Sequence, residues 1–256
     1  MPPSFDQVVT TLRSAGCVFA EDEAALILST ARTPAELTAM VDRRADGLPL
    51  EHVLGWAEFS GLRIAVDPGV FVPRRRTEFL VRQALALSRP TPVVVDLCCG
   101  SGAVGVALAA ALPGAELHAA DIDPAAVRCA VRNVGGVGTV HEGDLFGPLP
   151  PVLRGRVGLL AANVPYVPTD EVGLLPPEAR VHEPLVALDG GGDGLDILRR
   201  VGAEAPDWLA PGGSLLVETS ERQADRAVEA FTNAGLTARL AVSEDLHAHV
   251  VIGTRR

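Results

Sequence analysis

The chain lacks lysine altogether, and arginine carries all of its permanent positive charge. There are 22 basic residues, all arginine, against 32 acidic residues, which leaves a formal net charge of −10. A protein whose main partner is nucleic acid needs a basic face, so this balance disfavours stable nucleic-acid binding. The local exception is the run Arg74, Arg75 and Arg76. Such a run is most often solvated surface, and the alternative is that it meets an acidic group.

Cysteine and long apolar runs are also scarce. The chain has four cysteines with no C-x-x-C pair and no regular spacing: Cys17, Cys98, Cys99 and Cys129. No apolar run reaches the roughly 18 residues of a membrane span, and the acidic N-terminal stretch has no signal-peptide core. We therefore expect a cytoplasmic protein with free thiols and no membrane partner. His247 and His249 share a face of an expected strand, but no third ligand lies nearby in sequence, so we expect no metal site.

Helical spacing of apolar residues dominates the N-terminal part. The predicted helices span 5–16, 21–31 and 33–47. The pattern then changes to alternating apolar residues over 58–74, with turn signals at Ser60-Gly61 and Asp67-Pro68-Gly69. The sequence thus predicts a small helical domain over 1–48, followed by a β-hairpin linker over 49–72.

From residue 73 onward, strand-like and helix-like segments alternate. The predicted strands span 92–97, 116–121, 138–144, 157–163 and 212–219. The predicted helices span 77–87, 103–112, 124–134, 194–209 and 223–235, and two further strands at 237–243 and 247–254 follow. Continuously apolar strands separated by helices form a parallel sheet covered on both faces. We predict an α/β, Rossmann-like domain over 73–256 with a mostly parallel seven-stranded sheet that ends in an antiparallel hairpin.

A glycine-rich turn follows the first of these strands. In "VVVDLCCGSGAVGVAL", Gly100, Gly102 and Gly105 have the spacing G-x-G-x-x-G. Such a turn brings backbone N–H groups and a helix N-terminus toward an anionic or polar ligand. Nicotinamide proteins and S-adenosylmethionine proteins both use it. Asp121, at the end of the second strand, fits the ribose hydroxyls of either cofactor.

Asp96 favours S-adenosylmethionine over a dinucleotide. A carboxylate at the tip of the first strand would repel a pyrophosphate, whereas it suits the sulfonium and ammonium charges of S-adenosylmethionine. The alternative role for Asp96 is to cap the loop that follows it. Asp144, at the end of the third strand, can accept a hydrogen bond from an adenine amino group. We expect S-adenosylmethionine as the cofactor and no metal, and we keep a nicotinamide-dependent oxidoreductase as the alternative from another class.

The fourth strand ends in Asn163, Val164, Pro165 and Tyr166, on the rim where open α/β sheets bind ligands. Methyl transfer requires the acceptor nitrogen to be held about 3–3.5 Å from the donor carbon. The Asn163 side-chain oxygen can accept one N–H of a planar amide, and the carbonyl of Val164, held extended by the following proline, can accept the other. Tyr166 offers a flat face for stacking. The alternative interpretation is a proline-bent loop after a strand.

In these motifs the chain resembles the HemK/PrmC-type protein-(glutamine-N5) methyltransferases, which modify the glutamine of the GGQ motif in peptide-chain release factors. The resemblance runs from about residue 49 onward and rests on "HVLGWAEFSGLRIAVDPGVFVPRRRTE", "DLCCGSGAVGVALA", "AADIDPAAVRCAVRN", "GDLF", "NVPYVP", "VHEPLVALDGGGDGLDILRR" and "APGGSLLVE". It implies a class I S-adenosylmethionine-dependent methyltransferase fold. It also implies that the N-terminal helical domain engages a protein substrate.

Matching the family motifs residue by residue gives a set of expected site residues. With Asp96, the expected cofactor-binding residues are Phe71, Pro73, Thr77, Cys98, Cys99, Gly100, Ser101, Gly102, Asp121, Ile122, Asp144, Leu145 and Asn163. The expected catalytic residues are Asn163, Val164, Pro165 and Tyr166.

The chain departs from the family pattern at two site positions. Val164 replaces the first proline of the usual N-P-P-Y motif, and Cys98 replaces a glycine. The N-terminal helical part is also short for the family, and these three departures together suggest a divergent paralogue with another substrate as the alternative. The expected acceptor is a glutamine side chain in a protein, and the alternative acceptor is an exocyclic amino group on a nucleobase or small molecule. We interpret Cys98 and Cys99 as small apolar loop residues without a chemical role.

Overall fold

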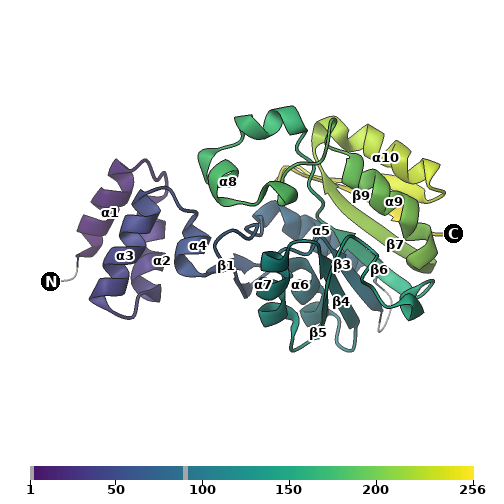
Figure 1. The fold of residues 1–256 in the computed structure, drawn as a ribbon, viewed down its shortest axis with the longest axis horizontal. Coiled ribbons are helices and arrows are strands. Elements are labelled where there is room, and N and C mark those ends of the chain that lie inside the picture. The colour runs from purple at the N-terminus through teal and green to yellow at the C-terminus, as the bar shows by residue number, and fades with distance from the viewer. Residues whose placement is uncertain (1–2, 89–91) are drawn as a thin grey trace.

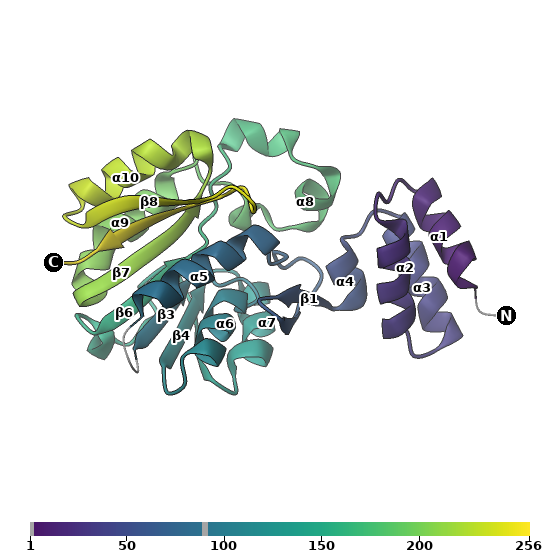
Figure 2. The same ribbon diagram turned by 180° about the vertical axis from the view of Figure 1, so that it is seen from behind.

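The computed structural model describes residues 3–88 and 92–256. A cluster of N-terminal helices lies at one end of the molecule, and a sheet with helices on both faces forms the rest (Figures 1 and 2). None of the helices in these described residues is long and apolar enough to cross a membrane.

Four helices form the N-terminal bundle: α1 (Phe5–Ser14), α2 (Ala20–Thr30), α3 (Pro34–Ala45) and α4 (Leu50–Leu54). Ser4 forms a capping box with Gln7 at the start of α1, and Thr33 caps α3 ahead of Pro34. The apolar stripes of the four helices share one core. Val53 belongs to that core, so the bundle extends past residue 48. A helix as short as α4 shows no full apolar period, which is why the sequence predicted only a hairpin over 49–72.

The hairpin lies against the sheet domain. Strands β1 (Trp56–Phe59) and β2 (Leu62–Ala65) pair antiparallel, and the turn between them uses Ser60 and Gly61 at positive φ. Phe59 and Ile64 are buried in the core of the sheet domain. The hairpin is therefore anchored to the sheet domain, on the side nearer the N-terminal bundle.

Seven strands form the main sheet, in the order β5-β4-β3-β6-β7-β9-β8. They are β3 (Val93–Leu97), β4 (Glu116–Asp121), β5 (Gly138–Glu142), β6 (Val157–Ala162), β7 (Leu209–Thr219), β8 (Thr237–Ser243) and β9 (Ala248–Thr254). Strands β3 to β7 run parallel, and β9 is antiparallel to both β7 and β8. The predicted mostly parallel seven-stranded sheet with a final antiparallel hairpin is confirmed.

Helices cover both faces of this sheet. One face packs against α5 (Glu78–Leu87), α6 (Ala103–Ala111) and α7 (Pro124–Val134), and the other against α9 (Asp196–Trp208) and α10 (Ala224–Asn233). The chain leaves β3 toward β4 on one side and later returns to β6 on its other side. The carboxyl ends of β3 and β6 are therefore a topological switch point, where open α/β sheets bind their ligands.

The long segment 164–194 contains short helical pieces. They are η3 (Thr169–Leu174), α8 (Pro177–His182) and η4 (Leu185–Ala187), and they arch over the carboxyl edge of the sheet (Figure 1). Each of these pieces directly follows a proline, which is well suited to precede or start a helical turn.

Candidate functional site

A cavity of about 630 Å³ lies at the switch point, a size typical of small-molecule sites. Residues that follow β3, β4, β5 and β6 line its inner wall, and α8 and its neighbours line the outer wall. Every residue expected from the sequence to bind cofactor or acceptor lines this cavity, with the exception of Gly102. Segments far apart in the chain are thus brought to one place.

Two glycines of the G-x-G-x-x-G turn serve packing. Gly102 has φ +78, and a Cβ there would lie 2.7 Å from a methyl group of Val134. A Cβ on Gly105 would lie 3.0 Å from the Asp96 carboxylate. Both positions bring the start of α6 close to its neighbours, so the turn needs glycine there for close approach. Gly102 is a packing residue at the base of the turn and does not belong to the cavity wall.

Cys98 and Cys99 are buried, unreactive thiols. Cys98 has φ +52, a left-handed conformation that glycine adopts without cost and a residue with a Cβ does not. Burial raises the pKa of both thiols well above the ordinary value. The thiolate is the reactive form of cysteine, so these thiols stay neutral and unreactive. This supports their interpretation as apolar loop residues.

Asp96 both caps the turn and faces the cavity. Its Oδ2 accepts the Gly105 N–H at 2.7 Å, which is the capping role considered from the sequence. The residue is 1% exposed, and this burial, reinforced by the nearby Asp121 charge, raises its pKa to about 7. A cationic group in the cavity would favour the ionised form of Asp96.

Asp121 organises the turn from the neighbouring strand. Its Oδ2 accepts the Gly100 N–H at 2.8 Å, and its Oδ1 accepts the Asp123 N–H at 2.9 Å. A carboxylate has about four lone-pair sites, so each oxygen can accept another bond from a ligand hydroxyl.

Asp144 has a partner that the sequence did not reveal. Its Oδ2 lies 2.5 Å from Nη2 of Arg200, which reaches it from α9 and also lines the cavity. The pair fixes one carboxylate oxygen, and a carboxylate still has further acceptor sites for an amino group. Leu145, next to it, has φ +47 and its side chain is buried in the core.

Asn163 carries an orphaned acceptor. Its Oδ1 is buried, and within the described part of the chain it has no hydrogen-bond partner. An unpaired buried polar atom is costly, and at a cavity wall it is the expected state of a group that waits for a ligand donor. The neighbouring Val164 is 1% exposed and packs into the core.

Tyr166 is held by a cluster of polar side chains. Its hydroxyl donates to Glu218 Oε1 at 3.3 Å and accepts from Arg76 Nη2. Glu218 also accepts from Arg76 Nε at 2.9 Å and from Thr77 Oγ1 at 2.6 Å. Burial, with the nearby Glu218 charge, raises the pKa of Tyr166 to about 12, so its hydroxyl stays protonated.

The arginine run meets buried carboxylates, so the solvated-surface interpretation is wrong for two of its three members. Arg74 pairs with Glu183 at 2.6 Å and lies over the Phe71 ring, while Arg76 pairs with Glu218. Glu183 also accepts the Val72 N–H at 3.1 Å, which fixes the segment that carries Phe71 and Pro73. Of the three arginines in the run, only Arg75 is exposed and has no carboxylate partner among the described residues.

Comparison with known proteins places this geometry in a family. The family model of the methyltransferase small domain matches residues 61–146. A release factor glutamine methyltransferase from Geobacter sulfurreducens is 42% identical over 79% of this chain and 72% of its own length. Proteins of the same name from Mycolicibacterium smegmatis and Streptomyces coelicolor are 41% and 38% identical, over 81% and 85% of this chain and 74% and 79% of their own. The chain belongs to the release factor glutamine methyltransferase family. This confirms the family resemblance and favours it over a nicotinamide-dependent oxidoreductase.

Solved structures agree on the fold. A methyltransferase from Pyrococcus furiosus has a TM-score of 0.58 at 17% identity, over 76% of this chain and 89% of its own. A ribosomal protein L11 methylase from Lactobacillus delbrueckii subsp. bulgaricus has a TM-score of 0.54 at 16% identity, over 75% and 85%. This chain therefore has the class I methyltransferase fold that its sequence predicts.

Sequence reasoning missed four polar residues that shape the site in this family member: Glu183, Arg200, Glu218 and Gln223. The first two lie in the motif "VHEPLVALDGGGDGLDILRR", which carried the resemblance but suggested no role for any residue. Glu218 did have a signal, because a carboxylate ends the otherwise apolar run "SLLVE" of a central strand. A buried charge of this kind needs partners, and that requirement points to a functional cluster.

Proposed function

We propose that this chain binds S-adenosylmethionine in the cavity and methylates the side-chain amide of a glutamine in a peptide-chain release factor. The observation that carries the proposal is the buried Asn163 Oδ1, an acceptor at the cavity wall whose partner is missing from the described residues. The names of the relatives support the same acceptor.

The cavity chemistry fits the cofactor. When bound, S-adenosylmethionine supplies a methyl group on a positively charged sulfur. The inner wall carries carboxylates, among them Asp96, Asp121 and Asp144, which suit cationic, hydroxyl and amino groups. The lining arginines Arg74, Arg76 and Arg200 are all paired with carboxylates. A dinucleotide pyrophosphate would therefore meet acidic groups and already neutralised arginines, so this wall disfavours it.

The acceptor loop suits a planar nitrogen with two protons. Asn163 Oδ1 accepts one N–H of the amide, and the Val164 carbonyl, held extended before Pro165, accepts the other. Accepting a hydrogen bond from each N–H orients the amide and favours lone-pair density on its nitrogen as the new bond forms. Tyr166 supports the amide plane from one side. No residue of the loop needs to act as a strong base.

Val164 keeps this geometry without the usual proline. Its side chain is buried in the same core as Leu145 and Leu195, so packing replaces the rigidity that a ring would supply. The substitution is thus compatible with the function of the family.

Radiolabelled methyl transfer to a release factor tests the proposal, with Asn163→Ala as the variant. We expect kcat/KM to fall by about 10²–10³, as when one preorganised hydrogen-bonding group is removed from an active site. Calorimetry with S-adenosylmethionine separates an effect on acceptor binding from one on cofactor binding, which is needed because Asn163 is expected to contact both.

Two results would contradict the proposal. Unchanged label transfer by Asn163→Ala would refute the acceptor assignment, and tight NAD binding without S-adenosylmethionine binding would refute the cofactor. Label on a nucleobase or small molecule, with none on the release factor, would instead support the alternative acceptor.

A further inference from the structure

Tyr166 is held at both of its ends by one short segment of the chain. Strand β7 ends at Thr219 and leads into η5 (Glu221–Gln223). From this segment, Glu218 contacts the Tyr166 hydroxyl and Gln223 contacts the Tyr166 backbone carbonyl. Gln223 contacts none of the expected cofactor-binding residues, whereas Glu218 also accepts a hydrogen bond from one of them, Thr77.

At the hydroxyl end, Glu218 is a fully engaged buried carboxylate. It is 2% exposed and accepts hydrogen bonds from the Tyr166 hydroxyl, the Arg76 guanidinium and Thr77. Burying a carboxylate is costly unless its oxygens are hydrogen-bonded, so these partners and Glu218 fix one another. The Tyr166 ring therefore cannot swing without breaking up this cluster.

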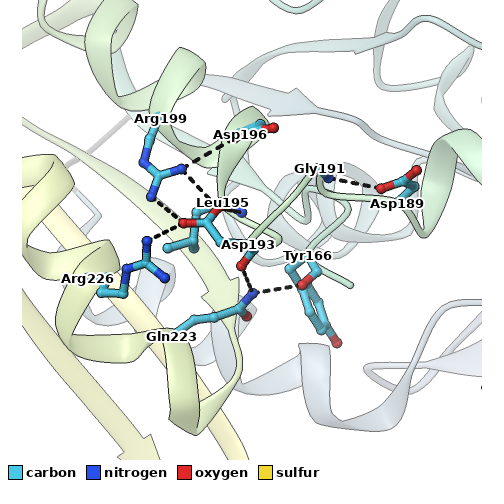
Figure 3. A network of polar contacts seen from close by, with 9 residues as sticks. All are labelled: Tyr166, Asp189, Gly191, Asp193, Leu195, Asp196, Arg199, Gln223 and Arg226. Atoms are coloured by element: carbon cyan, nitrogen blue, oxygen red, sulfur yellow. Dashed lines mark hydrogen bonds and ion pairs between the residues drawn. The ribbon is translucent and has the colours of Figure 1, made fainter. Parts of the chain in front are cut away.

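At the carbonyl end, the Gln223 amide joins two loops (Figure 3). Its Nε2 donates to Tyr166 O at 2.9 Å and to Asp193 O at 3.0 Å. The Gln223 side chain is itself oriented by Ser220, whose hydroxyl donates to Oε1 at 2.6 Å. The Asp193 carboxylate is held in turn by Arg199 and Arg226, which anchors its loop to α9 and α10 (Figure 3).

The glycine-rich segment 190–194 closes against the acceptor loop from the outside. The Gly190 N–H donates to Val167 O at 2.8 Å, and a Cβ on Gly190 would lie 2.6 Å from Pro165 O. A Cβ on Gly194 would overlap both Tyr166 O and Gln223 Nε2. Only glycine permits this close approach. The segment 190–194 and Gln223 together therefore restrict the Tyr166 backbone to one position.

We propose that Glu218 and Gln223 are positioning residues that fix the Tyr166 ring and backbone in place before the acceptor arrives. The proposal rests on the proposed function, in which Tyr166 supports the plane of the acceptor amide. Packing of the buried Val164 side chain holds the start of the loop. The contacts at both ends of Tyr166 hold the end of the loop, and preorganisation of this kind lowers the entropic cost of reaching a reactive geometry.

The chain contains a single tyrosine, so the first test needs no substrate. In protein labelled with ¹³C-tyrosine, every ring signal belongs to Tyr166. We expect the phenolic carbon of the wild type to stay constant to about pH 11, since the pKa of Tyr166 is raised to about 12 by burial and by Glu218 against the lowering effect of Arg76 and Arg74. Glu218→Gln should bring the titration toward the ordinary value, and Gln223→Met should shift or broaden the ring signals.

The second test is kinetic and uses the same variants with release factor and S-adenosylmethionine. We expect each variant to lower kcat about 10- to 100-fold, the scale of a small misplacement in an active site. Calorimetry should give an unchanged cofactor Kd for Gln223→Met, which contacts none of the expected cofactor-binding residues. In a Tyr166→Phe background, Glu218→Gln should cost little more because the hydroxyl is already gone. Gln223→Met should still lower kcat in that background, because the backbone carbonyl remains.

Controls keep the outcomes distinct. Glu229→Gln on the exposed face of α10 and Gln83→Met on α5 make the same chemical changes away from the site and should match the wild type. Far-ultraviolet circular dichroism reports folding, and if Gln223→Met does not fold, the comparison of Glu218→Gln in the wild-type and Tyr166→Phe backgrounds decides.

Unchanged Tyr166 signals in folded variants, or full additivity of Glu218→Gln with Tyr166→Phe, would overturn the proposal. A wild type that labels no release factor would refute the proposed function alone, since the NMR result stands without it.

Discussion

At the residue scale, the site depends on a few buried polar groups placed among apolar ones. For Asp96, the sequence predicted the position in the site correctly but gave no indication of the raised pKa. Its position after a strand and before a glycine turn indicated a cavity residue, and the structure places it there. The raised pKa could not be predicted, because it comes from burial and from Asp121, a residue on the neighbouring strand.

Asp96→Asn tests that burial through the pH dependence of stability. The pKa of Asp96 rises from 3.8 to about 7 on folding, so the folded state holds the proton more tightly. The stabilisation linked to this proton is complete below about pH 4 and is lost as the pH rises toward 7. Asparagine cannot ionise, so without ligand the variant should gain up to about 4 kcal/mol over the wild type between these pH values. Urea unfolding at pH 4.5 and pH 8 (about the ends of this window) measures it, and a difference that does not change with pH would contradict the burial argument.

At the element scale, length and periodicity decide what the sequence can predict. The central strands β3 and β6 are nearly continuous apolar runs and the long helices carry apolar stripes, so the positions of these elements were predicted to within a few residues. Helices α4 and α8 were missed because neither is long enough to show a period. The role of the glycine-rich segment 190–194 arises from contact with Tyr166, which the local sequence does not encode.

Gly194→Ala tests this contact between elements, with Gly235→Ala as the matched control. Both glycines have positive φ, +74 and +84, so both variants bear the backbone cost of about 1 kcal/mol. At Gly235 an added Cβ meets nothing within 4 Å, whereas at Gly194 it overlaps Tyr166 O and Gln223 Nε2. We expect Gly194→Ala to lose a further 1–3 kcal/mol or so of unfolding free energy and to slow methyl transfer. Equal effects of the two substitutions, by urea unfolding and by label transfer, would show that the contact is unimportant.

At the scale of the whole molecule, long-range ion pairs join parts that the sequence presents as separate. Arg44 in the N-terminal bundle binds Glu23 of the same bundle at 2.6 Å and Glu178 of α8 at 2.6 Å. The bundle is thus connected directly to the segment that forms the outer wall of the cavity. A protein substrate reaching the cavity past α8 would lie close to the bundle, in keeping with the role that the family resemblance implies for it.

The acidic balance of the whole chain is also found inside the cavity. The arginines that line the cavity are each neutralised by a carboxylate, so the acidic balance seen in the composition also holds inside the site. Composition predicted the absence of a basic face, but it could not predict these pairs, whose partners lie on different elements. The fold and the location of the site follow from local patterns, whereas the contacts that fix the acceptor loop follow only from tertiary packing.

Tandem mass spectrometry of a release factor incubated with this chain and S-adenosylmethionine tests the central claim most directly. We predict a mass gain of one methyl group on the glutamine of the GGQ motif, and a rate of this gain about 10²–10³ times lower with Asn163→Ala. An unmodified glutamine after incubation with folded, cofactor-binding protein, or a methyl group on a different residue of the release factor, would contradict it.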